Sequence, residues 1–473
     1  MNFWRRGVGW EWIFVIARSL ELQALPYALN RPPRAAASFN GQFDTSIIAS
    51  QFLTMRKRTR VATVSAGVVI SLIVLLWHFD ARRSLKLPTG KGRAVATMGY
   101  GHGVIVASDG SLWVWGQQDL GWPTLGMGYV EHQPFLKRLG KDRDWVDVAA
   151  DTAHTLALKA DGTIWAWGEN HSWELGDGTK TMRSTMVPSV PGHDWKQVAA
   201  GLHGLALKKD GTLWAWGNNW AGSLGTGTTN NSAVPVQVGS STNWVKVWAQ
   251  GIQSAGLQSD GSLWWWGYQL LQFNNTPHFI LEPTRLSADT NWVDVAMGFF
   301  KGFAIKSDGT LWAWGCDVDV FTGMPDSASN SVPHQVGTNH EWRACAFLGH
   351  GCVLLMKQDG SLWALDDALD QAGKRMNNPA WKMQPVTPSQ IKLPAPVVAF
   401  AGSYGATGVA LLSNGEVWTW GRVLGHPGIW LRLERDAGLF LSRIGIRSQL
   451  GQIQGRLGGV MRSEPWQLAN VPP

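Results

Sequence analysis

One eight-residue stretch, Asp161 to Gly168, returns along the chain and restricts the fold more than any other feature. It reads Asp-Gly-Thr-Ile-Trp-Ala-Trp-Gly. Counting this one, copies in various states of preservation begin at seven positions, spaced 48 to 55 residues apart: Asp109, Asp161, Asp210, Asp260, Asp308, Asp359 and Asn414. A period near fifty residues indicates tandem supersecondary units, each of which buries its apolar side chains against the next.

Each copy contains the signature of a β-hairpin. Asp-Gly or Asn-Gly separates two short apolar runs, and glycine takes the positive φ of a tight turn at little steric cost. After the turn, side chains alternate between faces, so Trp165 and Trp167 share one face and Ile164 and Ala166 share the other. Since both faces are apolar, we expect this strand in a sheet packed between two other sheets, as in propeller blades.

Two further marks repeat with the same period. A tryptophan opens an earlier strand in five units: Trp145, Trp195, Trp244, Trp292 and Trp342. A late proline recurs in all seven: Pro134, Pro188, Pro235, Pro283, Pro333, Pro388 and Pro465. We therefore expect four strands per unit, with an inner strand, the Asp-Gly hairpin, a long loop and an outer edge strand opened by proline.

The predicted fold class is all-β, a seven-bladed propeller of repeats of about 50 residues over 93–473. We expect its ring to close where the last strand, Pro465–Val471, meets the first, Ala94–Ala96. Most of the 30 tryptophans fall on the repeat pattern and are interpreted as packing between blades.

Charge is distributed unevenly. Residues 1–93 hold 14 Lys and Arg against 4 Asp and Glu, whereas residues 94–473 hold 27 against 30. The repeat domain is therefore mildly acidic, which argues against a broad phosphate-binding surface and against nucleic acid as the partner.

The N-terminal part differs from the repeats. Residues 1–54 show no clear pattern, and Met55 begins a basic stretch that precedes an apolar run without Asp, Glu, Lys or Arg, 61–79. This is the layout of an export signal, so we expect translation to start at Met55 and 1–54 not to be translated. Residues 55–80 are predicted to form the basic flank and a single transmembrane or signal-anchor helix, and 81–92 a linker.

Both flanks of the predicted helix are basic, so the positive-inside rule does not decide its orientation. The short tail ahead of an export-like segment favours an extracytoplasmic propeller. Neither the orientation nor cleavage of the signal is fixed by the residues.

The chain offers few groups for chemistry. Its three cysteines, Cys316, Cys345 and Cys352, lack metal-ligand spacing, and we interpret them as buried free thiols. No glycine-rich phosphate loop, nucleophile elbow or clustered carboxylate pair appears. We expect no enzymatic activity, no cofactor and no metal.

The second and third units resemble a known family. His154-Thr-Leu-Ala-Leu is followed by Asp161 to Gly168 and then by Glu174-Leu-Gly-Asp-Gly178, and the third unit repeats this order from His203 to Gly227. These motifs are similar to the regulator of chromosome condensation repeat, and the chain resembles bacterial membrane-anchored or exported members of that family over roughly 93–471.

The resemblance implies a seven-bladed β-propeller that recognises proteins through loops at the ends of a rigid ring. Known members include a nucleotide exchange factor for a small nuclear GTPase, ubiquitin-ligase appendages and secreted inhibitors of β-lactamases. The exchange factor works through a wedge-like hairpin, and the third unit here has no matching insertion.

One aligned position, seven residues before each turn, is predicted to form a ring near one mouth of the channel: His102, His154, His203, Gln253, Lys301, Cys352 and Thr407. Histidines one blade apart are too far from each other to share a zinc ion at about 2 Å ligand distances. We expect them instead to bond the backbone of neighbouring loops.

The seventh unit departs from the period through an insertion at about 422–447. It is rich in aromatic and arginine residues, which are typical interface anchors, and its candidate partner-binding residues are Trp430, Arg432, Arg435, Phe440 and Arg443. A self-packed loop is the alternative interpretation.

Together these features predict a membrane-anchored, monomeric propeller that binds a protein partner. The alternatives are a guanine nucleotide exchange factor for a small GTPase and an inhibitor or ligand of an extracytoplasmic enzyme. The sequence does not identify the partner.

Overall fold

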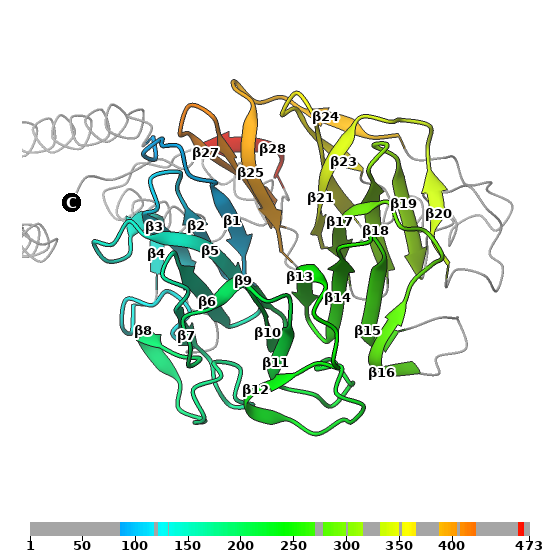
Figure 1. The fold of residues 1–473 in the computed structure, drawn as a ribbon. Coiled ribbons are helices and arrows are strands. Elements are labelled where there is room, and N and C mark those ends of the chain that lie inside the picture. Colours follow the sequence, from blue (N-terminus) through cyan, green and yellow to red (C-terminus); the bar gives the residue numbers. More distant parts are fainter. Residues whose placement is uncertain are drawn as a thin grey trace, which may run out of the picture. The chain divides into compact units, whose positions relative to one another are not determined.

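The structure, a computed structural model, describes residues 86–117, 122–130, 132–269, 278–298, 301–315, 332–349, 352–365, 387–403, 407–421 and 462–467. These residues belong to the compact unit Ser84–Asn470. They form seven four-stranded antiparallel sheets arranged as blades about an axis (Figure 1). The predicted all-β seven-bladed propeller is therefore confirmed.

Each blade uses four consecutive strands, from the axis outward. The innermost strands are β1 (Val95–Met98), β5 (Trp145–Ala150), β9 (Trp195–Ala200), β13 (Trp244–Gln250), β17 (Trp292–Met297), β21 (Trp342–Leu348) and β25 (Val397–Gly402). The second strands are β2 (His102–Val106), β6 (His154–Lys159), β10 (His203–Lys208), β14 (Gln253–Gln258), β18 (Lys301–Lys306), β22 (Cys352–Lys357) and β26 (Thr407–Leu412).

The third strands follow the Asp-Gly turns and are β3 (Leu112–Gln117), β7 (Ile164–Gly168), β11 (Leu213–Gly217), β15 (Leu263–Gln269), β19 (Leu311–Gly315), β23 (Leu362–Leu365) and β27 (Val417–Gly421). The outer strands are β4 (His132–Arg138), β8 (Arg183–Pro188), β12 (Ser232–Gln237), β16 (His278–Arg285), β20 (His334–Val336), β24 (Ser389–Ile391) and β28 (Arg462–Gln467).

The Asp-Gly-Thr sequence forms the turn between β6 and β7 through side chain and backbone together. Asp161 Oδ1 accepts hydrogen bonds from the backbone N and the hydroxyl of Thr163, at 2.9 and 2.7 Å. Gly162 has φ of +85°, and a Cβ there would lie 2.1 Å from the carbonyl oxygen of His193. Both the conformation and the space therefore require glycine.

The two faces of β7 are buried against different blades, as the alternating pattern predicts. Trp167 packs with Val104 and Val114 of the first blade. Ile164 and Ala166 pack with residues of the third blade. Trp167 also donates from Nε1 to the carbonyl oxygen of Thr124, at 2.9 Å, which ties the second blade to the loop of the first.

Ring closure differs from the prediction. The last strand, β28, pairs with β27 of its own blade, whereas β1 packs against β25 and β26. Apolar side chains of the first and seventh blades form one cluster that includes Ile105 and Val409. Side-chain burial between complete blades thus closes the ring, because each repeat already supplies all four of its strands.

The predicted position of proline is correct in two blades and wrong in others. Pro333 and Pro388 directly precede β20 and β24, but Pro188 ends β8, and Pro235 and Pro283 lie inside β12 and β16. An outer strand has one unpaired edge. A proline inside it is tolerated where its nitrogen faces that edge, because no hydrogen bond of the ladder is then lost.

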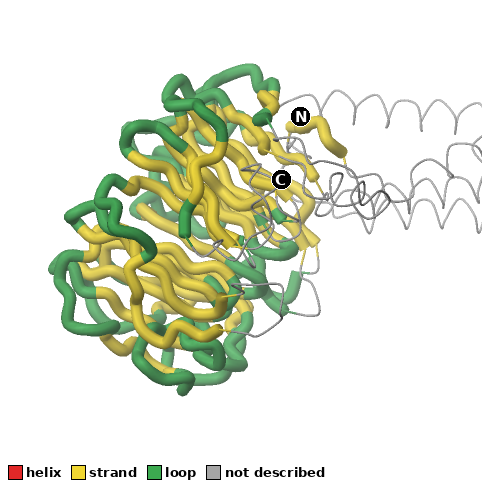
Figure 2. Tube along the Cα trace, turned by 90° about the vertical axis from the view of Figure 1, so that its right-hand side faces the viewer, coloured by secondary structure: helices red, strands yellow, loops and turns green. Residues whose placement is uncertain are grey.

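The antiparallel order gives the propeller two distinct faces. We define the hairpin face as the one with the Asp-Gly turns, where the innermost strands begin, and the loop face as the one where the second strands begin. Figure 2 shows the sheets from the side, with loops along their ends. The predicted segments 1–54 and 61–79 lie outside the described residues, and within the ranges given above no helix is long and apolar enough to cross a bilayer.

Candidate interaction surface

The seven aligned positions predicted to form a ring are the first residues of the seven second strands. All seven side chains are buried, with exposed fractions of 9% or less. None of them lines the central cavity, whose walls come from the innermost strands. They therefore lie in the interior at the loop face and present no open ligand set.

Two of the three histidines bond side-chain hydroxyl groups of the next blade, where we had expected backbone of a neighbouring loop. His102 Nε2 lies 3.0 Å from Thr155 Oγ1, and His203 Nε2 lies 2.7 Å from Ser254 Oγ. The residue of the third blade aligned with Thr155 is Gly204, and His154 Nε2 has no hydrogen-bond partner among the described residues.

Burial lowers the pKa of these imidazoles, to about 3 for His102 and His203 and to about 4 for His154. They are therefore neutral at physiological pH and act as hydrogen-bonding groups of the core. Gln253 donates from Nε2 to the carbonyl oxygen of Tyr268, at 2.9 Å, and Lys301 is buried.

The described parts of the chain hold no group of three or more His, Cys, Asp or Glu side chains that could bind a metal ion. Cys345 and Cys352 are buried free thiols, as predicted, and Cys316 lies outside the described residues. The predicted partner-binding residues of the seventh unit, Trp430 to Arg443, also lie outside them.

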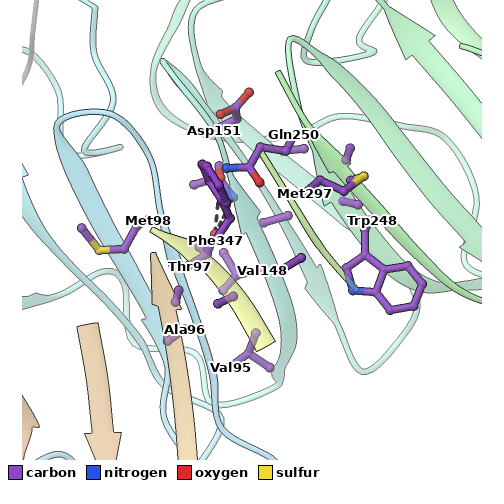
Figure 3. Close-up of a pocket in the computed structure, with 18 of the residues that line it drawn as sticks. Val95, Ala96, Thr97, Met98, Val148, Asp151, Trp248, Gln250, Met297 and Phe347 are labelled. Atoms are coloured by element: carbon purple, nitrogen blue, oxygen red, sulfur yellow. Dashed lines mark hydrogen bonds between the residues drawn. The ribbon is translucent and has the colours of Figure 1, made fainter. Parts of the chain in front are cut away.

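The channel along the axis holds a cavity of about 280 Å³ lined by all seven innermost strands. In Figure 3, Asp151 and Gln250 lie at one end of this cavity and Val95 lies at the other. Small side chains such as Ala96 and Val148 form most of the wall. Charged side chains, among them Asp147, Asp151 and Lys246, also line this cavity, so its wall is mixed in polarity.

Side chains near the hairpin face link the innermost strands around the channel. Asp147 Oδ2 accepts from the backbone N of Val198, at 3.1 Å, and the amide of Gln197 bonds both backbone groups of Val247, at 3.1 and 2.9 Å. Lys246 Nζ lies 2.5 Å from Asp294 Oδ1. These bonds link neighbouring blades at the hairpin-face end of the channel.

The loop face carries an exposed aromatic cluster between the third and fourth blades, which we name the aromatic cluster. Its members are Trp220, Tyr268 and Phe279, with ring centroids 5.9 to 6.3 Å apart. Trp220 is 50% exposed and Phe279 is 38% exposed. Large aromatic side chains left half in water are typical anchors of protein interfaces.

The loop that presents Trp220 is held rigidly by its neighbour Asn219. The side-chain amide of Asn219 donates to the carbonyl oxygens of Thr228 and Asn230, both at 2.9 Å, and its oxygen accepts from the backbone N of Leu224. Asn170 makes the same pattern of bonds in the second blade. Trp220 is therefore offered on a preorganised loop, which lowers the entropic cost of binding.

Trp173, on the matching loop of the second blade, is strained. Its φ of +66° is the one positive value of a non-glycine residue in the part of the chain that the structure describes, and the aligned residue of the third blade is Gly222. Lys180 Nζ lies 3.9 Å from the centre of its ring. Bulky residues in the left-handed region are unusual and are often found at functional sites.

The sequence did not identify these residues because tryptophan is abundant throughout the repeats. One signal was available: Trp220 and Trp173 lie between the repeated hairpin and the outer strand, away from the two positions that pack between blades. An aromatic residue off the repeated core pattern is a candidate for the surface.

Comparisons with known proteins agree with this architecture. Sequence profiles of the regulator of chromosome condensation (RCC1) repeat match residues 145–172 and 210–249. The chain is 38% identical over 82 residues to the protein RCC2 homolog of Xenopus laevis, which covers 17% of this chain and 16% of that protein. It is 29% identical over 116 residues to the human E3 ubiquitin-protein ligase HERC2, covering 24% of this chain and 2% of that ligase.

Two solved structures share the fold. Human WBSCR16 superposes with a TM-score of 0.56 at 20% identity, over 76% of this chain and 93% of that one. Yeast RCC1 (Prp20), in complex with Kap60, gives a TM-score of 0.53 at 18% identity, over 65% and 78%. The two sequence matches, to the RCC2 homolog and HERC2, cover less than a fifth of those proteins' length. They show the repeats, and the two structural matches show the fold.

Proposed function

Because this chain belongs to the regulator of chromosome condensation repeat family, we propose that it is a protein-interaction module that recognises its partner with the loop face of blades two to four. The observation that carries the proposal is the aromatic cluster, in which Trp220 is half exposed on a loop fixed by Asn219. Rigid aromatic anchors supply most of the binding energy in many protein interfaces.

Recognition without catalysis also agrees with the interior of the propeller. Its buried residues His102 and His203 each bond a hydroxyl group of the next blade and so act in packing. A module of this kind acts through the shape and chemistry of its surface.

The test is affinity capture from detergent-solubilised membranes with the wild-type chain and the double variant Trp220→Ala, Phe279→Ala. We expect the partner recovered with wild type to be lost with the variant, while the circular dichroism and melting temperature stay close to wild type. Tyr129→Ala removes another exposed aromatic residue, 74% exposed, outside the cluster and serves as the matched control. Equal recovery with the double variant would contradict the proposal.

We further propose that residues 61–79 anchor the propeller to a membrane as a single span and that the propeller is extracytoplasmic. The support is the length and apolar character of this run, together with the basic stretch before it. A reporter enzyme fused to the C-terminus, active on only one side of the membrane, tests the orientation; activity in the cytoplasm would contradict it.

A second candidate is nucleotide exchange on a small GTPase. It is favoured by the structural likeness to Prp20p, a protein studied for its binding to Gsp1p and histones. This role needs a cytoplasmic propeller, so the same reporter distinguishes the two. An inhibitor or ligand of an extracytoplasmic enzyme needs the opposite orientation and is a form of the interaction module proposed above.

A further inference from the structure

A β-bulge recurs where each innermost strand begins, at the hairpin face. In blades two to seven the register against the second strand shifts by one residue near the start of the innermost strand. Each shift leaves one residue unpaired, and a bulge re-aims the side chain it carries. The six unpaired residues, which we name the bulge collar, are Val146, Lys196, Val245, Val293, Arg343 and Val398.

Four members of the bulge collar are valines that are 37% to 45% exposed. Single exposed valines are ordinary on protein surfaces, but these occupy the same place in four blades around one axis. Their repetition gives this mouth of the channel an aliphatic rim.

The same mouth contains a second cavity, of about 400 Å³, lined by residues of the first, fourth, fifth, sixth and seventh blades. Its charged lining residues are Arg93, Lys246, Asp294 and Arg343, and Val293 and Val398 of the bulge collar line it too. Three cations therefore face one carboxylate in this cavity.

Within the described parts of the chain, the two arginines are not paired with an anion. Asp294 is committed through both oxygens, to Lys246 Nζ at 2.5 Å and to the backbone N of Cys345 at 3.0 Å. Among the described residues, no acidic side chain or hydrogen-bond acceptor lies within bonding distance of the side chain of Arg93 or Arg343. Both residues are exposed, so an anion from outside can reach them.

The nearby Asp147 does not fill this role. Its oxygens accept from the backbone N of Val148 and of Val198, both at 3.1 Å. Burial raises the pKa of this carboxyl to about 6, and the fields of Arg93 and Lys246 only partly oppose that rise. Even with Asp147 ionised, these charges sum to one positive charge, which a single carboxylate would balance.

We propose that the channel mouth at the hairpin face binds an acidic aliphatic peptide segment of a partner protein, with Arg93 and Arg343 holding a carboxylate and the valines of the bulge collar contacting the neighbouring aliphatic side chains. Guanidinium groups match carboxylates with paired hydrogen bonds. A dianionic phosphate fits less well because the local excess of charge is small. This site lies on the face opposite the aromatic cluster and is independent of it.

The test uses the full chain in detergent and fluorescein-labelled Leu-Glu-Val-Glu-Leu as the probe, with anisotropy as the readout. We expect wild type to bind this peptide more tightly than Leu-Gln-Val-Gln-Leu and to lose affinity as salt rises. The double variant Arg93→Gln, Arg343→Gln is expected to weaken binding by about tenfold or more. The control is Lys137→Gln, Lys141→Gln, which removes two exposed charges outside the cavity.

A second variant, Val293→Ser and Val398→Ser, tests the aliphatic contacts and is expected to weaken binding while the salt dependence remains. Equal binding of the glutamate and glutamine peptides would overturn the proposal, as would unchanged binding by the arginine variant with its fold intact. The proposal is also overturned if only a phosphoserine peptide, or only vesicles rich in phosphatidylserine, bind in an arginine-dependent way.

Discussion

Asp151 of the second blade accepts a hydrogen bond from the backbone N of Gly251 in the fourth blade, at 3.0 Å, across 100 residues of sequence. Gly251 in turn accepts from the backbone N of Leu202 in the third blade, at 2.6 Å. Three successive blades are thus joined at the loop-face end of the channel by one carboxylate and one glycine.

The Asp151→Asn variant is expected to be more stable than wild type at neutral pH. Burial raises the pKa of Asp151 from 3.8 to about 6, so the folded protein holds a proton that the unfolded chain has lost between these values. Wild type therefore loses stability as pH rises through this window, by roughly 2 to 3 kcal/mol at most. Asparagine keeps an acceptor for Gly251 and does not ionise.

Urea unfolding at several pH values measures this effect. The stability difference between variant and wild type should be small at pH 4, grow up to pH 6 and stay constant above it. A difference that does not vary with pH would mean that Asp151 ionises in the folded protein as easily as in the unfolded chain.

Thr155→Val is expected to destabilise the protein although it preserves side-chain shape. It removes the hydroxyl group that lies 3.0 Å from His102 Nε2 and leaves a buried imidazole nitrogen without a partner. An unsatisfied buried polar group costs about 1 to 3 kcal/mol. The free energy of unfolding in urea should fall by this amount, and His102→Leu in the same background should cost much less than it does in wild type.

Lys208→Gln tests a repeated cation site between two tryptophans. Lys208 Nζ lies 5.0 Å from the ring centre of Trp195 and 4.8 Å from that of Trp214, and it pairs with Asp194 at 3.1 Å. We expect a loss of about 1 kcal/mol, because the cation–π contacts disappear and Asp194 loses its partner.

The fourth blade supplies the control for this change. There the lysine and aspartate positions hold Gln258 and Asn243, joined by a hydrogen bond of 3.1 Å, and the tryptophan pair remains 6.0 Å apart. The double variant Asp194→Asn, Lys208→Gln should therefore recover part of the loss. No recovery would indicate that the cation itself, more than its pairing, stabilises the blade.

The repeat pattern was sufficient to predict the blade architecture and the faces to which the tryptophan side chains point. Period and alternation are local properties, so the sequence alone assigns Trp167 and Ile164 to opposite faces. The constant distance from the turn also identified the seven aligned residues, and the structure shows that each is the first residue of a second strand.

What could not be predicted depends on the neighbouring blade. The partner of each histidine is set by whether the next repeat holds Thr155, Gly204 or Ser254 at one position, and the repeats do not share that residue. The bulges were missed, although each breaks the alternation of its strand: Trp145 and Val148 are both buried and stand three residues apart. The exposure of Trp220 could not be predicted either, because it depends on how the loops of neighbouring blades pack.

Trp173→Gly is expected to give a more stable protein than Trp173→Ala. At φ of +66° alanine keeps the steric strain of the left-handed region, whereas glycine, which the third blade uses at the aligned Gly222, relieves it. The glycine variant should therefore exceed the alanine variant by about 1 kcal/mol in urea unfolding, even though glycine favours the unfolded chain at most positions. Both variants lose the contact of Lys180 with the ring, at 3.9 Å, so the comparison isolates the backbone. An alanine variant as stable as the glycine variant would show that the loop relaxes to a negative φ and stores no strain at Trp173.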